Sequence, residues 1–152
     1  MTSDFGKYFE DLELDVPIKH SLSKTIFESD NNLFSLLTMN HHPVHLNIDY
    51  ASKSQHEKIL VVGTLVLSLA VGITVQDISG KAIANLGYEE VEHLGPVFVN
   101  DTIYVSSVIL NKWETSKKNR GIVHVETVVE NQNGKKVLSF RRKVLVPKRS
   151  EL

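Results

Sequence analysis

The chain has no cysteine, and its 152 residues show no large excess of either charge. The absence of thiols excludes disulfides, cysteine nucleophiles and thiolate metal sites. A net charge of −1 leaves no basic surface of the kind that nucleic-acid binding requires, so we expect no nucleic-acid partner. The N-terminal stretch MTSDFGKYFEDLELD is acidic and lacks the apolar run of a secretory signal. Together with the missing cysteines, this favours the cytoplasm as the compartment.

The sequence also lacks internal repeats, low-complexity tracts and linkers, so we predict that residues 1–152 form one domain. Its one long uncharged run, ILVVGTLVLSLAVGITV at 59–75, approaches the length of a membrane span. The run contains glycine, serine and threonine, and only Lys58 precedes it as a cation, so membrane insertion is weakly favoured. We therefore predict a buried core helix over 59–75 and no association with a membrane.

The stretch ESDNNLFSLLTM predicts a shorter helix with Ser29 or Asp30 as its N-cap. Its apolar residues recur at helical spacing and are expected to form one stripe: Leu33, Phe34, Leu36 and Leu37. Pro43 cannot continue this helix, which is therefore expected to end near Asn40. The histidines that follow are predicted to lie on a turn.

After the long helix the hydrophobic period changes from helical to alternating, which is typical of β-strands. We predict strands within 81–95, 102–111, 121–131 and 136–146, with a further strand near 21–26. The dipeptide Asn133-Gly134 is a strong signal for a hairpin between two of them. A long apolar helix followed by antiparallel strands predicts an α+β fold in which a curved sheet surrounds one central helix.

Three of the seven histidines are clustered in the stretch TMNHHPVHLNIDY. They allow three interpretations: a metal site, a proton-transfer site, or a polar solvated loop. Zinc sites often use histidines at i and i+4 on a helix, but His41 and His45 have this spacing across a proline that breaks the helix. Asp49 could add an oxygen ligand, yet the pattern has low specificity, and we predict no metal.

The histidine segment leads to the expected N-terminus of the long helix, where backbone N–H groups lack intrahelical acceptors. Such an end attracts negative charge, and Gly63 would let a ligand approach the backbone closely. An N–H there could stabilise a thioester carbonyl that gains oxyanion character, while a histidine moves a proton at neutral pH. That pair fits addition of water to an activated double bond. Two structural alternatives stay open: Gly63 could serve helix packing, and His45 could bond to a backbone carbonyl.

The stretch LTMNHHPVHLNIDYA resembles the hydratase signature of the MaoC-like (R)-specific enoyl-CoA hydratases, written G-D-x-N-P-[LIV]-H with a small residue further on. The matching residues are Pro43, Val44, His45 and Ala51. The departures are Met39 in the glycine place, Asn40 in the catalytic aspartate place, His42 in the asparagine place, and Val62 where many relatives have histidine. This form is similar to the branch that hydrates mesaconyl-CoA, itaconyl-CoA and related branched dicarboxylyl thioesters.

The resemblance spans most of the chain and implies a hot-dog fold, a homodimer with acyl-CoA bound near the subunit interface, and no cofactor beyond the thioester itself. It implies that His45 is the catalytic acid–base group and that the amide of Gly63 binds the thioester carbonyl. Asn40 cannot ionise, so its amide would orient the water. His42 and Val62 would border the substrate.

Two sets of basic residues are candidates for the anionic parts of such a substrate. By period two, Arg142 shares the apolar face of the strand at 136–146, where a guanidinium needs an anionic partner or an exit to water. The partner could be the free carboxylate of a dicarboxylyl substrate or the acid of a structural salt bridge. Lys117, Lys118 and Arg120 lie on a predicted loop that could meet CoA phosphates or form a solvated hairpin tip.

Two other functions stay open for such a protein. A hot-dog thioesterase commonly carries an acid on or near the central helix, and residues 59–76 contain none, although Glu57 precedes them. A non-catalytic acyl-CoA-binding protein also fits, with Asn40 marking lost activity. Loss of enoyl absorbance without thiol release would distinguish a hydratase from both.

Overall fold

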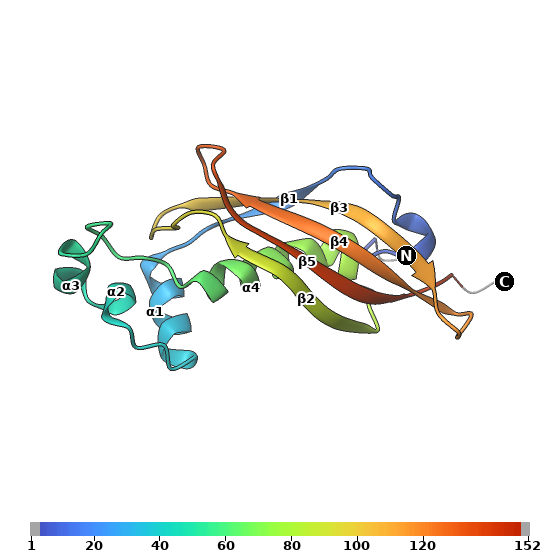
Figure 1. The fold of residues 1–152 in the computed structure, drawn as a ribbon, viewed down its shortest axis with the longest axis horizontal. Coiled ribbons are helices and arrows are strands. Elements are labelled where there is room, and N and C mark those ends of the chain that lie inside the picture. Colours follow the sequence, from blue (N-terminus) through green and yellow to red (C-terminus); the bar gives the residue numbers. More distant parts are fainter. Residues whose placement is uncertain (1–3, 150–152) are drawn as a thin grey trace.

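The computed structural model describes residues 4–149, which form one antiparallel sheet, one long helix and several short helices (Figure 1). In chain order the elements are a 3-10 turn (Phe9–Asp11), β1 (Ile18–Thr25), α1 (Glu28–Leu37), α2 (Pro43–Leu46), α3 (Ile48–Ser52), α4 (Gly63–Thr74), a π-helical turn (Val75–Ser79), β2 (Ala84–His93), β3 (Thr102–Glu114), β4 (Arg120–Glu130) and β5 (Lys136–Pro147). The strand order is β1-β3-β4-β5-β2, and every neighbouring pair is antiparallel.

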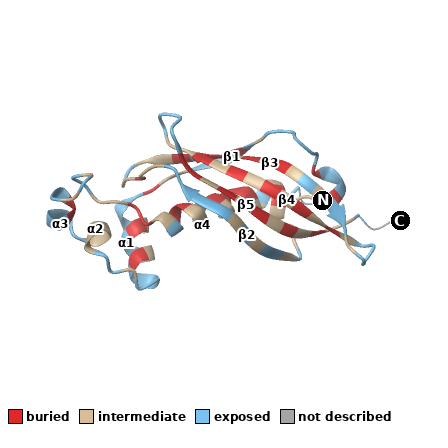
Figure 2. Ribbon diagram, viewed as in Figure 1, coloured by how far each residue is buried: buried red, intermediate tan, exposed pale blue. Residues whose placement is uncertain are grey.

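The sheet and α4 pack face to face and enclose the main core. Val66 and Ala70 of α4 and Phe140 of β5 are each at most 2% exposed in this core. Burial alternates along β4 as expected for a strand with one face on the core (Figure 2). Gly134 has a φ of 71° in the β4–β5 hairpin, a backbone conformation that glycine adopts readily. The predicted α+β hot-dog fold and the hairpin are confirmed.

The long helix begins later than predicted. Residues 60 and 61 are extended because they pair with the chain after β2: Leu60 forms a bridge with Phe98, and the N–H of Val61 donates to the carbonyl of Val97 at 2.8 Å. These long-range pairings delay the helix to Gly63. Within residues 4–149, no helix combines the length and the apolar character needed to cross a membrane.

The N-terminus of α1 also differs from the prediction. The helix begins at Glu28 with Phe27 as its N-cap, so neither Ser29 nor Asp30 holds that position. Asp30 still stabilises this end from inside the first turn, where its carboxylate accepts the Phe27 N–H at 2.9 Å. A negative charge in the first turn is favourable because the unpaired N–H groups there carry partial positive charge.

The predicted apolar stripe of α1 is not its buried face. Leu33 and Leu37 are 67% and 77% exposed, whereas Asn31 and Ser35 are buried. Only Phe34 of the predicted stripe packs against the core. The helix turns a polar face inward because Asn31 hydrogen-bonds the backbone that leads into α4.

The histidine segment contains a helix where a turn was predicted. Pro43 occupies the first position of the one-turn helix α2, where a missing N–H costs nothing. The prediction that the preceding helix ends before Pro43 is confirmed, since α1 ends at Leu37, whereas His45 lies in α2 and not on a turn. Helices α1 to α3 project beyond the sheet next to the start of α4 (Figure 1), and their surfaces are largely exposed or half-buried (Figure 2).

Candidate active site

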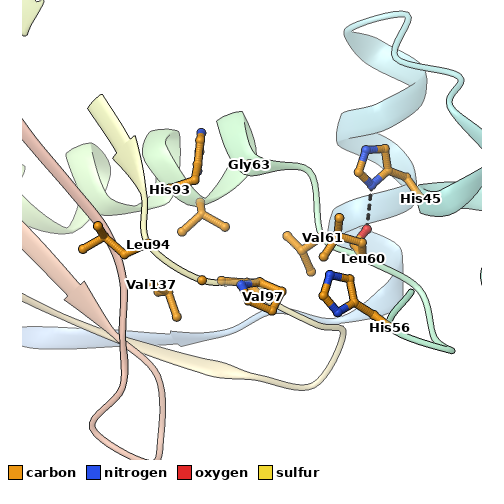
Figure 3. A pocket seen from close by; sticks show the side chains of 12 residues that line it. His45, His56, Leu60, Val61, Gly63, His93, Leu94, Val97 and Val137 are labelled. Carbon is orange, nitrogen blue, oxygen red and sulfur yellow. Dashed lines mark hydrogen bonds between the residues drawn. The ribbon is translucent and has the colours of Figure 1, made fainter. Parts of the chain in front are cut away.

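A cavity of about 360 Å³ opens beside the first turn of α4. Its wall is largely apolar, and its titratable side chains are three histidines: His45, His56 and His93 (Figure 3). The residues that line it include no carboxylate, lysine or arginine. Across residues 4–149, no group of three histidine, aspartate or glutamate side chains is arranged to hold a metal ion.

His45 lies in α2 and faces the segment that leads into α4 (Figure 3). Its Nδ1 is 2.7 Å from the carbonyl oxygen of Leu60. A carbonyl oxygen only accepts hydrogen bonds, so Nδ1 carries a proton, and in the neutral form of the ring the lone pair lies on Nε2. A hydrogen bond from His45 to a backbone carbonyl was the structural alternative to a catalytic role. The structure contains this bond, and it also orients the ring so that Nε2 can accept a proton.

Asn31 of α1 is 1% exposed and ties the parts of this site together. Its Nδ2 donates to the carbonyls of His45 at 3.2 Å and Leu60 at 3.4 Å, and its Oδ1 accepts the N–H of Val62 at 2.9 Å. One side-chain amide thus holds the backbone of His45, the carbonyl that orients the His45 ring, and the residue before α4.

Asn31→Leu is expected to lower the free energy of unfolding by about 2 kcal/mol. Leucine has a similar volume but forms no hydrogen bonds, so the buried backbone groups that Asn31 contacts lose their partner. The substitution should also lower kcat roughly tenfold or more, since the loss of these bonds frees the backbone that positions His45. Urea unfolding and steady-state kinetics measure the two effects. Ser35→Ala is the matched control on the same helix face, because the buried Ser35 hydroxyl has no hydrogen-bond partner among residues 4–149. Equal effects of the two variants would contradict the role of Asn31.

Gly63 is the first residue of α4, and its N–H has neither a side-chain cap nor another acceptor within the described chain. The ring of His93, at the end of β2, lies against it (Figure 3). A Cβ at Gly63 would lie 2.7 Å from His93 Cε1 and 3.0 Å from its Nε2. Glycine is therefore needed at position 63 because the His93 ring lies close to the backbone there. It also leaves room for a ligand to approach the N–H.

Three other predicted site residues, Asn40, His42 and Val62, do not line the cavity. Asn40 is in the turn between α1 and α2, where its Oδ1 is 3.4 Å from the backbone nitrogen of His42. His42 caps α2 through its Nδ1, which accepts the N–H of Val44 at 3.2 Å. Val62 is 3% exposed and belongs to the core. The catalytic role of Asn40 and the substrate contacts of His42 and Val62 stay predictions.

Arg142 is buried on the core face of β5, as period two predicted, but it does not line the cavity. Its Nη2 donates to the hydroxyls of Thr74 at 2.7 Å and Ser79 at 3.3 Å, at the end of α4 away from Gly63. Burial lowers the pKa of the guanidinium, and Nε has no hydrogen-bond acceptor within the described part of the chain. No acid of the described residues pairs with Arg142, so the predicted salt bridge is wrong, and its contact with substrate stays a prediction.

Lys117, Lys118 and Arg120 lie at the connection between β3 and β4. Figure 1 shows this connection at the end of the molecule opposite α1 to α3. The 13 residues of β3 correspond to roughly 40 Å of strand between the two ends. One chain therefore does not bring these residues to its own cavity, and their contact with CoA phosphates stays a prediction.

The MaoC like domain family matches residues 11–132, which is most of the chain. The chain belongs to this family. A mesaconyl-CoA hydratase of Cereibacter sphaeroides is 35% identical over 149 residues, which are 98% of this chain and 43% of that protein. A beta-methylmalyl-CoA dehydratase of Chloroflexus aurantiacus is 33% identical over 144 residues, which are 95% of this chain and 41% of that protein.

A solved structure of a MaoC domain protein dehydratase from Chloroflexus aurantiacus matches the fold with a TM-score of 0.93 at 31% identity, over 99% of this MaoC-like chain and 43% of that one. The chain thus spans less than half the length of these relatives. The family resemblance carried by the histidine segment is confirmed.

Three residues that the structure places at the site carry little signal in the sequence. Asn31 stands between Asp30 and Asn32 in the polar first turn of a predicted helix, a pattern that usually marks a solvated face. His56 lies in a polar connection, and His93 ends a strand whose partner in the cavity, Gly63, is remote in sequence. Local periodicity does not reveal which strand end meets which helix start.

Proposed function

We propose that this MaoC-like protein adds water reversibly across the double bond of a short branched or dicarboxylyl enoyl-CoA, of the mesaconyl-CoA or itaconyl-CoA type. The observation that carries the proposal is the pairing, on one cavity, of His45 with a free Nε2 and Gly63 with an unpaired N–H. The activities named for the relatives support the class of acyl group. The reaction needs no cofactor beyond the CoA thioester, and the cysteine-free chain suits the cytoplasm.

The proposed chemistry follows from these two groups. The Gly63 N–H binds the thioester carbonyl and stabilises the negative charge that develops on its oxygen as water attacks C3. Nε2 of His45 accepts a proton from that water. The largely apolar wall of the cavity lowers the polarity around both groups, which strengthens both interactions. Dehydration runs through the same steps in reverse.

We infer that the working unit is a homodimer. β2 is an edge strand of the sheet, and its apolar side chains Leu86 and Tyr88 are 50% and 47% exposed. An exposed edge with apolar side chains is a liability that pairing with a second copy removes. Sedimentation of a monodisperse monomer at micromolar concentration would contradict this inference.

The substrate class is tested by mixing the protein with crotonyl-CoA, mesaconyl-CoA and itaconyl-CoA while following enoyl absorbance and free thiol separately. The expected result is loss of absorbance without thiol release. Thiol release would instead identify a thioesterase, a reading that the absence of a carboxylate from the cavity wall already disfavours. Binding with neither change would identify a non-catalytic acyl-CoA-binding protein.

Asn40→Asp is expected to raise the ratio of crotonyl-CoA to mesaconyl-CoA turnover. The new carboxylate adds negative charge beside the histidine segment, which repels a dicarboxylyl group and leaves a neutral crotonyl group unaffected. Asn40→Ala is the control that removes the amide without adding charge, and it should lower both rates alike. Both substrates are measured at limiting and saturating concentration. An unchanged ratio in Asn40→Asp would show that no substrate carboxylate approaches Asn40.

A further inference from the structure

Hydration of an enoyl thioester requires two proton transfers, because water gives up a proton as its oxygen attacks C3 and C2 must receive one. His45 is oriented to accept the first, since only its Nε2 is free. Asn40 cannot donate a proton to carbon, and it does not line the cavity. The second proton can come back from the protonated His45 or from another side chain of the cavity, and the other titratable side chains there are His56 and His93.

His93 is the better placed of these two. The three atoms nearest to a Cβ at Gly63 all belong to the His93 ring, between 2.7 and 3.1 Å away. A thioester carbonyl bound at the Gly63 N–H would place its C2, one bond beyond the carbonyl carbon, next to this ring. The imidazole is exposed to the cavity and has no hydrogen-bond partner among residues 4–149, so both nitrogens are available to a ligand. The ring of His56 instead packs edge-on against Phe98, with centroids 5.5 Å apart.

Resting on the proposed hydration, we propose that His93 is the general acid that protonates C2 while His45 acts as the base. The water oxygen forms its bond to C3 as the π bond between C2 and C3 breaks, and Nε2 of His45 takes one water proton. The electron pair of the π bond passes through the thioester enolate, held at the Gly63 N–H, and forms the C2–H bond with a proton from the His93 imidazolium. His45 ends protonated and His93 neutral, so the charge of the pair is conserved. Solvent at the open cavity returns the proton between turnovers.

The test compares the full-length wild type with three variants: His93→Phe, which keeps a planar ring over Gly63, His93→Ala, which leaves space, and His56→Phe, the control from the same cavity. We expect both His93 variants to lose roughly 100-fold in kcat with crotonyl-CoA and mesaconyl-CoA, while KM and the thermal midpoint stay close to wild type. Added imidazole should restore turnover in His93→Ala but not in His93→Phe, where the ring fills the space. His56→Phe should keep most of its kcat.

Each outcome has a defined meaning. Wild-type kcat in His93→Phe would overturn the proposal. A His93→Ala variant that imidazole does not restore would also overturn it, because added imidazole can replace a proton donor but not a residue that only packs against Gly63. A large loss in His56→Phe with normal His93 variants would transfer the role to His56. A wild type that consumes none of the enoyl thioesters would refute the proposed hydration itself, which separates that failure from an error about His93.

Discussion

His45→Ala is expected to lower the kcat for hydration by roughly 100-fold to 10,000-fold, the usual contribution of a general acid–base group. The fold should persist because the ring is only half-buried and, within residues 4–149, its one hydrogen bond is the contact with the Leu60 carbonyl. Turnover of mesaconyl-CoA measures the first effect, and the thermal midpoint followed by circular dichroism measures the second.

Three further variants make this result specific to proton transfer. In His45→Asn the side-chain amide can still donate to the Leu60 carbonyl but has no basic nitrogen, so it should be as inactive as His45→Ala. His41→Ala changes an exposed neighbour and should keep full activity. His42→Ala removes the side-chain cap of α2, which costs about 1 kcal/mol of stability and a smaller part of the activity. Near-normal turnover in His45→Asn would transfer the catalytic role to another residue.

The sheet was predictable because local pattern and tertiary burial agree there. Alternation along β3 to β5 and the Asn133-Gly134 turn gave the strands and a hairpin, and the same alternation placed Arg142 on the buried face. The partner of Arg142 was not predictable, because alternation along a strand indicates which face of the sheet a side chain lies on but not which residue it contacts. In the structure that neighbour is a pair of hydroxyls at the end of α4 rather than an acid.

The only predictable residues of the candidate site were those that local sequence signals indicate. His45 and Gly63 follow from the signature and from the position of a helix start, and the structure brings both to one cavity. The start of α4 was misplaced because Leu60 and Val61 pair with residues after β2, which no local propensity encodes. The same long-range pairing brings His93 close to Gly63. The wrong start of α4 and the missed cavity residue His93 therefore have the same physical cause.

Gly63→Ala is expected to lower kcat/KM by roughly 100-fold or more while the protein stays folded, because the methyl group obstructs a backbone donor of the oxyanion type. The new Cβ would lie 2.7 Å from His93 Cε1, a contact that forces the imidazole to move. Because that imidazole is the end of an exposed side chain, it can rotate away at little cost to stability. The displaced ring and the methyl group together close the approach to the N–H of residue 63.

Gly72→Ala is the matched control, since it makes the same change in the same helix where a Cβ meets nothing within 4 Å. Alanine should stabilise the helix there by about 0.5–1 kcal/mol and leave turnover unchanged.

The double variant Gly63→Ala/His93→Ala separates two possible causes of the loss of activity in Gly63→Ala. If Gly63→Ala acts only by displacing His93, the double variant is no slower than His93→Ala alone. If the methyl group also obstructs the thioester carbonyl, the double variant is slower than either single variant, and wild-type activity in Gly63→Ala would remove the N–H of Gly63 from the mechanism.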